Sequence, residues 1–218
     1  MIIEENFKYG IPSDRERIKD KNLLTYSAMM IQSNWSDEDL DERRYVYYNK
    51  LNKEEMSDIM KVSMRTINRN ISALIKTGLL ETIETPNGIA YKFNYKKDNN
   101  QYVQIENDIM KELVHTSTNV IATYVLMKYH LKDGIKQMTQ EYIAEEIGLS
   151  KSSRKLIEPI TKILAKLGLI MIHRRFEKET LKMANGQIKV IPKECIYYEL
   201  VTHEDWVNLN QLIVREMD

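Results

Sequence analysis

The chain of 218 residues contains little glycine, little proline and a single cysteine. Its 7 glycines and 4 prolines are few for this length, which disfavours all-β folds rich in tight turns and glycine-rich phosphate loops. The lone cysteine, Cys195, excludes an intrachain disulfide framework and a metal site built from several cysteines. No apolar run approaches the ~18 residues that cross a bilayer, and the first residues lack the basic and apolar regions of a signal peptide. These absences favour a cytoplasmic protein without membrane contact.

An excess of charge of either sign is also missing. Lys plus Arg number 32 and Asp plus Glu number 32, so the formal net charge is zero. A uniformly basic coat for nucleic acid is therefore excluded, and any nucleic-acid site must arise from local segregation of charge. Hydrophobic residues make up 43% of the chain and charged residues 29%, the proportions of a globular protein. We expect an α+β protein that is mainly α, with small β-hairpins.

Two segments of the chain, residues 56–80 and 143–170, share one layout. Each holds a short amphipathic stretch, an apolar residue followed by serine, a stretch of helical periodicity, and Gly-Leu at the start of an apolar strand. A longer apolar helix is expected before each segment, over residues 23–32 and 119–131. The chain therefore contains two copies of one structural unit.

A β-hairpin is expected after each Gly-Leu pair, over residues 79–95 with a turn at Pro86-Asn87-Gly88 and over residues 169–201 with a tip at Asn185-Gly186. A helix-turn-helix followed by a hairpin is a winged helix, so the pattern predicts tandem winged helix-turn-helix domains.

The polar stretch Lys96–Asn100 places the domain boundary near residue 100. This gives an N-terminal domain of residues 1–100 and a second domain of residues 101–218. Residues 1–20 and 36–50 are polar and charge-rich, which indicates an arm and a loop. Residues 202–217 are expected to form a final helix.

The second copy is longer than the first between its serine and its Gly-Leu pair, and Pro159 lies in the extra length. We expect a kink there, because proline removes one backbone hydrogen bond and clashes with the preceding turn. The apolar positions Leu156, Ile160, Ile163 and Leu167 keep helical spacing and predict a buried stripe.

The helix expected after Ser63 has an apolar face and a polar face. Ile67, Ile71, Leu74 and Ile75 would anchor it, and no acidic residue occurs between Val62 and Gly78. Ser63 can cap its first turn, which leaves a positive helix end that attracts phosphate. Arginine pairs with guanine, asparagine with adenine, and serine with either bases or phosphates. The candidate DNA-binding residues on the polar face are Arg65, Asn68, Arg69, Ser72 and Lys76.

The second copy is more basic than the first. Between Ser150 and Lys178 eight basic residues stand against two acidic ones, a local net charge of plus six. Phosphate contacts of basic side chains position a protein on DNA, and base contacts specify the sequence. The candidate DNA-binding residues are Lys151, Ser152, Ser153, Arg154 and Lys155 at the start of the helix, with Arg174 and Arg175 on the next strand.

A family resemblance extends over residues ~7–95. Its residues are Leu23, Asn34-Trp35, Asp39, Tyr45, Tyr47, Ser63-x-x-Thr66-Ile67, Leu74 and Gly78-Leu79. This stretch resembles the N-terminal domain of plasmid replication initiators of the RepA-N type from Gram-positive bacteria. The Ser-x-x-Thr-Ile part is shared with many winged-helix regulators, whereas the Asn-Trp, Asp and Tyr part is more particular.

The resemblance implies a winged helix, origin DNA as the ligand, a homodimer, and a bacterial cytoplasm in which the protein is associated with the nucleoid or a plasmid. It also implies that Arg65, Thr66, Asn68 and Arg69 match the recognition-helix positions. The chain departs from that family because a second winged helix follows in place of a host-interaction domain. Its layout is similar to replication initiators and phage replisome organisers that have two winged-helix domains.

The sequence offers no catalytic site. The four histidines show no metal-ligand spacing, and no glycine motif for a nucleotide is present, so we expect no enzyme activity, no metal and no cofactor. We expect a protein specific for repeated double-stranded DNA sites, with AT-rich repeats as candidates, which initiates or controls replication of a plasmid, phage or mobile element together with replication proteins.

Two alternatives are a transcriptional repressor or copy-number regulator and a protein-interaction module of a replisome. A nicking enzyme with a tyrosine nucleophile is the least favoured.

Overall fold

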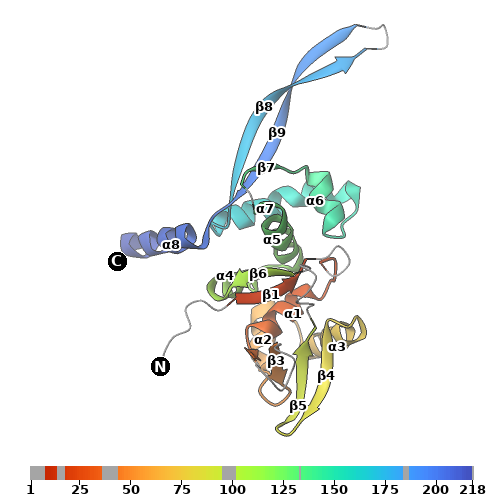
Figure 1. Cartoon of the computed structure of the whole chain (residues 1–218), viewed down its shortest axis with the longest axis vertical. Helices are drawn as coiled ribbons and strands as arrows, with labels where there is room; N and C mark the ends of the chain where they lie inside the picture. The colour runs from red at the N-terminus through yellow and green to blue at the C-terminus, as the bar shows by residue number, and fades with distance from the viewer. Residues whose placement is uncertain are drawn as a thin grey trace. The chain divides into compact units, whose positions relative to one another are not determined.

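The computed structural model describes residues 8–13, 18–35, 44–94, 102–132, 134–183 and 187–217. Within them, helices alternate with three antiparallel sheets that include two hairpins, so the expected α+β class is confirmed (Figure 1). The chain divides into two compact units, residues 1–126 and 127–218, and the division falls within helix α5, Thr118–His130. The predicted boundary near residue 100 lies outside the described residues.

Unit 1 contains two sheets and four helices that precede α5, among its described residues. In chain order the elements are β1 Lys8–Pro12, α1 Leu23–Met30, β2 Asn34–Trp35, β3 Arg44–Tyr47, α2 Lys53–Met60, α3 Met64–Lys76, β4 Leu80–Thr85, β5 Gly88–Phe93, β6 Tyr102–Glu106 and α4 Asn107–Leu113. One sheet has the strand order β2-β3-β5-β4, and β1 pairs with β6 in the other. The helix expected at residues 23–32 and the hairpin expected at residues 79–95 are both present.

The first hairpin has the turn that its residues predict. Thr85 pairs with Gly88, which leaves Pro86 and Asn87 in the turn, and Gly88 has a φ of 114° that favours glycine. The Thr85 hydroxyl also accepts a hydrogen bond from the Asn87 backbone N–H at 3.2 Å. The turn is therefore determined by local chemistry.

The core of unit 1 holds α3 against α1. Tyr26 of α1 is fully buried and meets Phe93 of β5 edge to face, with ring centroids 5.2 Å apart. The Asn70 side-chain amide of α3 donates to the Thr25 hydroxyl of α1 at 2.9 Å. The contact of Asn70 holds α3 against α1, and that of Tyr26 holds α1 against β5.

From α5 onward, the elements of unit 2 follow the same order as the elements of unit 1 from α1 onward. After α5 come β7 Lys136–Gln137, α6 Gln140–Glu146, the 3₁₀ helix η2 Lys151–Leu156, α7 Ile157–Lys166, β8 Ile170–Lys182, β9 Ile188–Leu200 and α8 His203–Met217. The strand order β7-β9-β8 corresponds to β3-β5-β4 of unit 1. The expected helix over residues 119–131, the second hairpin and the final helix are confirmed.

The helix expected after Ser150 is divided, and its predicted stripe is partly wrong. Residues 151–156 form the 3₁₀ helix η2, and α7 starts at Ile157. Pro159 therefore lies in the first turn of α7, where backbone N–H groups have no partner within the helix, so the missing N–H of proline costs no helical hydrogen bond. The change of helix type shifts the phase of the buried face. Ile160 is buried as expected, but Leu156 and Ile163 are 49% and 40% exposed. Ile157, Ile160, Thr161 and Leu164 form the buried face instead.

The prediction of an arm over residues 1–20 and a loop over residues 36–50 is wrong in two places. Residues 8–12 form β1, which pairs with β6, and Ile11 is fully buried. Residues 44–47 form β3, which pairs with β5. Both strands are short and get their stability from partners far along the chain, so local composition did not indicate them. The acidic run at 37–42, including Asp39 of the resemblance, and the tip at 184–186 lie outside the described residues.

Candidate nucleic-acid interface

Helix α3 presents a polar stripe to solvent. Its five predicted polar-face residues are all exposed and follow the i, i+3, i+4, i+7 and i+11 spacing of one helical face; they are Arg65, Asn68, Arg69, Ser72 and Lys76. We call this set the α3 stripe. The opposite face is buried through Ile67, Ile71 and Leu74, as predicted. The expectation for Ile75 is wrong: it lies at the edge of the apolar face and is 36% exposed.

The start of α3 is capped as predicted. Ser63 Oγ accepts a hydrogen bond from the Thr66 backbone N–H at 3.2 Å, and the two side-chain hydroxyls lie 3.0 Å apart. The first turn holds no acidic residue, so the positive end of the helix dipole is not opposed by its own side chains. Thr66, which the resemblance assigns to the recognition surface, is half-buried and contacts Ser63.

Two other contacts hold the middle of the α3 stripe. Lys53, the first residue of α2, donates from Nζ to Oδ1 of Asn68 at 3.0 Å, and the same Nζ lies 4.4 Å from the ring centroid of Tyr48. Ser72 donates from its hydroxyl to the backbone carbonyl of Asn68 at 3.0 Å. Lys53 adds a positive charge beside the stripe. Lys53 could not be identified from the sequence, because nothing in the spacing of Lys53 and Asn68 indicates that they meet.

The α3 stripe keeps its positive charge. Across the parts of the chain that the structure describes, no carboxylate forms an ion pair with Arg65, Arg69 or Lys76. The surface therefore combines uncompensated cations with an asparagine amide and a serine hydroxyl, held on one rigid helix. These groups can hydrogen-bond base edges and neutralise phosphates.

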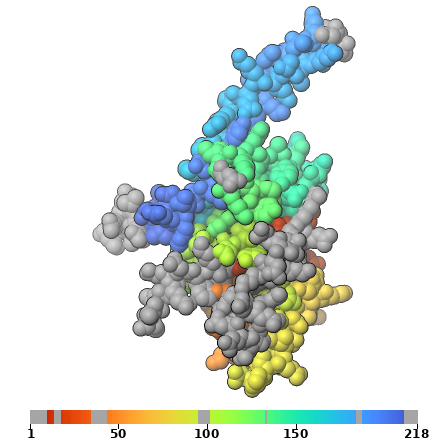
Figure 2. Space-filling view, viewed as in Figure 1, coloured from red at the N-terminus to blue at the C-terminus, as the bar shows by residue number. Residues whose placement is uncertain are grey.

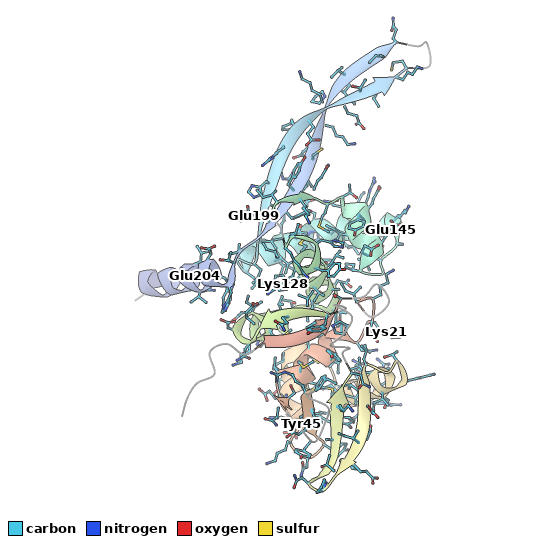
Figure 3. All side chains as sticks on the ribbon, in the orientation of Figure 1. Lys21, Tyr45, Lys128, Glu145, Glu199 and Glu204 are labelled. Carbon is cyan, nitrogen blue, oxygen red and sulfur yellow. The ribbon has the colours of Figure 1, made fainter. Side chains whose placement is uncertain are left out.

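The corresponding surface of unit 2 has a different electrostatic setting. Lys151 Nζ lies 3.2 Å from Oε1 of Glu145, which is labelled in Figure 3, and Arg154 forms an ion pair with Glu141. Both carboxylates come from α6, outside the segment in which the sequence shows a net positive charge. They reduce the field of that segment, since a pair of opposite charges in contact presents little net charge to a distant anion.

The serines that open η2 bond to one another. Ser150 Oγ lies 2.8 Å from Oγ of Ser152 and 2.9 Å from Oγ of Ser153, and Ser150 makes no side-chain cap hydrogen bond. Lys155 is exposed, and no ion pair to it occurs among the described residues. The structure therefore brings these candidate residues together at the surface, but with several of their hydrogen-bonding groups already engaged.

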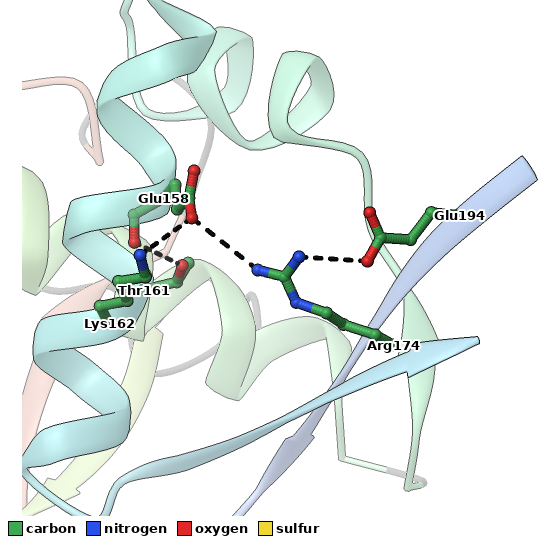
Figure 4. Close-up of polar contacts among 5 residues, drawn as sticks. All are labelled: Glu158, Thr161, Lys162, Arg174 and Glu194. Atoms are coloured by element: carbon green, nitrogen blue, oxygen red, sulfur yellow. Dashed lines mark hydrogen bonds and ion pairs between the residues drawn. The ribbon is translucent and has the colours of Figure 1, made fainter. Parts of the chain in front are cut away.

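The two candidate arginines of β8 lie on opposite faces of the strand. Arg174 lies between two carboxylates, 3.1 Å from Glu194 and 3.8 Å from Glu158 (Figure 4). Lys162 lies 3.0 Å from the same Glu158 and, chiefly through its hydrogen bond, lowers the pKa of that carboxyl. The Arg175 guanidinium carbon lies 5.0 Å from the ring centroid of Tyr197.

Unit 2 also has a cavity of about 400 Å³, lined in part by Glu141, Arg154 and Cys195. Cys195 is buried, and its thiol donates to Glu177 at 3.5 Å. Burial, together with the neighbouring Glu177, raises the pKa of this thiol. The thiol is therefore held in its protonated form and is not an activated nucleophile.

Two further features concern the described residues alone. In them, no three His, Cys, Asp or Glu side chains converge so as to hold a metal ion. None of the helices they form combines the length and apolar character needed to cross a bilayer.

Comparison with protein-family models, with curated proteins and with solved structures finds no match to the chain.

Proposed function

We propose that the chain is a sequence-specific, double-stranded DNA-binding protein that reads bases with α3 in the major groove. The observation that carries this proposal is the α3 stripe, in which Arg65, Arg69 and Lys76 are exposed and unopposed by described carboxylates. Arginine can bond guanine through two parallel hydrogen bonds, and asparagine can do so with adenine. A zero net charge limits attraction to DNA of any sequence, so affinity must come from this surface.

We further propose that each unit contains a winged helix, one within a domain of residues 1–100 and the other within a domain of residues 101–218. The repeated succession of a helix, a short strand, two further helices and a hairpin supports this assignment. So does the matching strand order of the two three-strand arrangements. In this arrangement the second helix of each pair faces the DNA and the hairpin follows the backbone.

The two units have different shares in the proposed binding. Lys151, Arg154 and Arg174 would have to exchange their carboxylate partners for phosphates before they could contribute. Arg65 and Arg69 face no such competition from described residues. Sequence recognition is therefore assigned to unit 1, and unit 2 adds affinity by raising the effective concentration of a second contact.

The biological role that we propose is initiation or control of replication of a plasmid, phage or mobile element in bacteria. The resemblance of residues ~7–95 to RepA-N initiators supports this role, and a homodimer and replication proteins are the partners that it implies. A transcriptional repressor would need the same contacts with DNA. Loss of an origin-bearing plasmid after deletion of the gene supports an initiator, whereas retained copies with altered transcript levels support a repressor.

DNA binding is tested by selection from a random-sequence duplex pool with the full chain, followed by titration of the recovered duplexes. We expect recovery of defined sequences and tenfold or more loss of affinity in the variant Arg65→Ala/Arg69→Ala, by about 1–3 kcal/mol for each base contact. Lys111→Ala is the matched control, because Lys111 is an exposed basic residue on α4. Failure to enrich any sequence, or equal affinities of all three proteins, would refute the proposal.

A further inference from the structure

The hairpin of unit 2 is much longer than its sheet. β8 and β9 have 13 residues each, but β7 pairs only with Tyr197 and Tyr198 of β9. From the pair Arg174 and Ile196 outward, the two strands continue as a two-stranded ribbon to the pair Lys182 and Ile188, over ~30 Å at 3.3 Å per residue. Figures 1 and 2 show this ribbon projecting from the helices of its own unit. We call it the arm.

One face of the arm carries three large apolar side chains that are exposed. The cross-strand pairs Phe176–Glu194, Lys178–Pro192, Thr180–Val190 and Lys182–Ile188 share this face, since paired residues and every second residue point to the same side. Phe176 is 76% exposed, Ile188 70% and Val190 55%. An exposed group of large apolar side chains indicates a surface that a partner covers.

The outer arm is also positive. From Thr180 to Pro192 the sequence contains Lys182 and Lys189 and no acidic residue. The carboxylates nearer the base are engaged: Glu179 with Lys193 at 2.9 Å, Glu194 with Arg174, and Glu177 with Tyr197 and Cys195. The partner that complements this end is therefore anionic and accepts apolar contacts.

We propose that the arm enters the minor groove of double-stranded DNA and bends it. Phe176, Ile188 and Val190 would wedge against base steps, and Lys182 on the same face would neutralise a phosphate. Apolar wedges of these residue types unstack base steps in minor grooves and bend the duplex by ~20–90°. The length of the arm, ~30 Å, is close to one helical turn of DNA. This inference rests on the proposed DNA binding and assigns unit 2 a contact that its ion-paired η2 surface does not supply.

A second copy of the chain is the less favoured occupant. Stable interfaces involve about 20–30 residues on each side, whereas the arm face offers three large exposed apolar side chains. Two copies that met through this face would also bring Lys182 of each copy into proximity, and like charges repel.

The test uses duplexes that the full chain recovers from the random pool, labelled at both ends with a fluorescent donor and acceptor. We expect the full chain to raise energy transfer between the ends, because bending brings them closer. The variant Phe176→Thr/Ile188→Thr/Val190→Thr keeps strand propensity and charge, and should lose this rise together with about tenfold in affinity. Ile135→Thr, at an exposed apolar position just before β7, is the matched control and should behave as the full chain does.

The outcomes separate the two proposals. If the triple variant bends and binds DNA like the full chain, while Arg65→Ala/Arg69→Ala still abolishes binding, the arm inference fails and the proposed function stands. If the pool yields no enriched duplex, both fail. If light scattering shows that the triple substitution converts a dimer to a monomer without changing the bend, the arm face binds a second copy and the minor-groove inference is wrong.

Discussion

Lys53 of α2 and Asn68 of α3 form a hydrogen bond from Nζ to Oδ1 at 3.0 Å, between the half-buried Lys53 and the exposed Asn68. The bond joins the two helices at the middle of the α3 stripe. It also orients the amide, because an Oδ1 that accepts from Lys53 leaves the Nδ2 donors on the other side. Asn68 is therefore held in position by the protein itself, and the ammonium of Lys53 becomes part of the same surface.

Replacing Asn68 by aspartate should separate stability from DNA affinity. In Asn68→Asp, the new carboxylate can pair with Lys53, and an exposed ion pair changes the free energy of unfolding by only ~0–1 kcal/mol. The same carboxylate repels phosphates and cannot donate to adenine, so we expect at least a tenfold loss of DNA affinity. Urea titration and fluorescence anisotropy measure the two quantities; a loss of affinity that merely tracks a loss of stability would contradict this role for Asn68.

Arg65 and Arg154 occupy comparable places in the two units, but their expected effects differ. Arg65→Ala should lose about 1–3 kcal/mol of binding free energy at the selected site. Arg154→Ala should lose less, because Glu141 already occupies the guanidinium. Glu141→Gln should raise affinity by releasing Arg154. Titrations of the three variants on one duplex decide the order, and a larger loss for Arg154→Ala would reverse our assignment of recognition to unit 1.

The cap of α3 should contribute measurably to stability. Ser63→Ala removes the acceptor for the Thr66 N–H, and such a loss costs about 1 kcal/mol of the free energy of unfolding. Ser72→Ala is a suitable control, because the Ser72 hydroxyl only bonds back to a carbonyl of its own helix and alanine favours the helix. Chemical denaturation should show a lower midpoint for the first variant and an equal or higher one for the second.

Pro159 should determine where α7 begins. In a continuous α-helix its ring would clash with the carbonyl of Lys155, four residues earlier, and the structure has η2 over Lys151–Leu156 instead. Pro159→Ala removes this restriction, so we expect more α-helical circular dichroism near 222 nm. Hydrogen exchange should slow for amides of residues 155–160. Unchanged helicity would show that tertiary contacts, rather than the proline, impose the 3₁₀ geometry.

His130 should make stability depend on pH below neutrality. Burial lowers the pKa of His130 from the usual 6.5, and Lys136 acts in the same direction against the opposing effect of Glu146. The unfolded chain therefore binds a proton at a higher pH than the folded chain, so the free energy of unfolding falls as pH decreases through 6.5. Nε2 of His130 lies 3.0 Å from Oη of Tyr142, and the neutral ring can accept a hydrogen bond from this hydroxyl.

Denaturation at a series of pH values from about 7.5 to about 5.5 measures this dependence. His130→Gln should flatten the slope, whereas His115→Gln, at an exposed position, should leave it as in the full chain. An equal slope in all three proteins would show that other groups control the acid response.

The features that could be predicted are those in which neighbouring residues decide the structure. Helix α3 was predictable because Ser63 caps it, Ile67, Ile71 and Leu74 recur at helical spacing, and Gly78 ends it with a φ of 72°. Its stripe was predictable for the same reason, since a buried face defines an exposed one. The divided second helix was only half predictable: Pro159 indicates a disturbance, but not whether the helix kinks or starts later.

The charge of a surface was not predictable, because the partners of an ion pair come from different elements. The segment from Ser150 to Lys178 is strongly basic in the sequence, yet Glu141, Glu145 and Glu194 from outside it face its cations. For the same reason, the contact between Lys53 and Asn68 could not be predicted from the sequence. The net charge of a sequence segment gives the charge of a surface only where no other helix or strand contributes side chains to that surface.

The amino-acid sequence alone determined the periodic helices, their caps, the Pro86-Asn87 turn and the two copies of one layout, because each follows from contacts within a few residues. The tertiary structure alone decided that β1 pairs with β6, that Ile11 is buried, and that unit 1 keeps exposed cations where unit 2 pairs them with glutamates. These outcomes depend on residues distant in the chain, whose meeting is set by how whole faces pack together and not by any local preference.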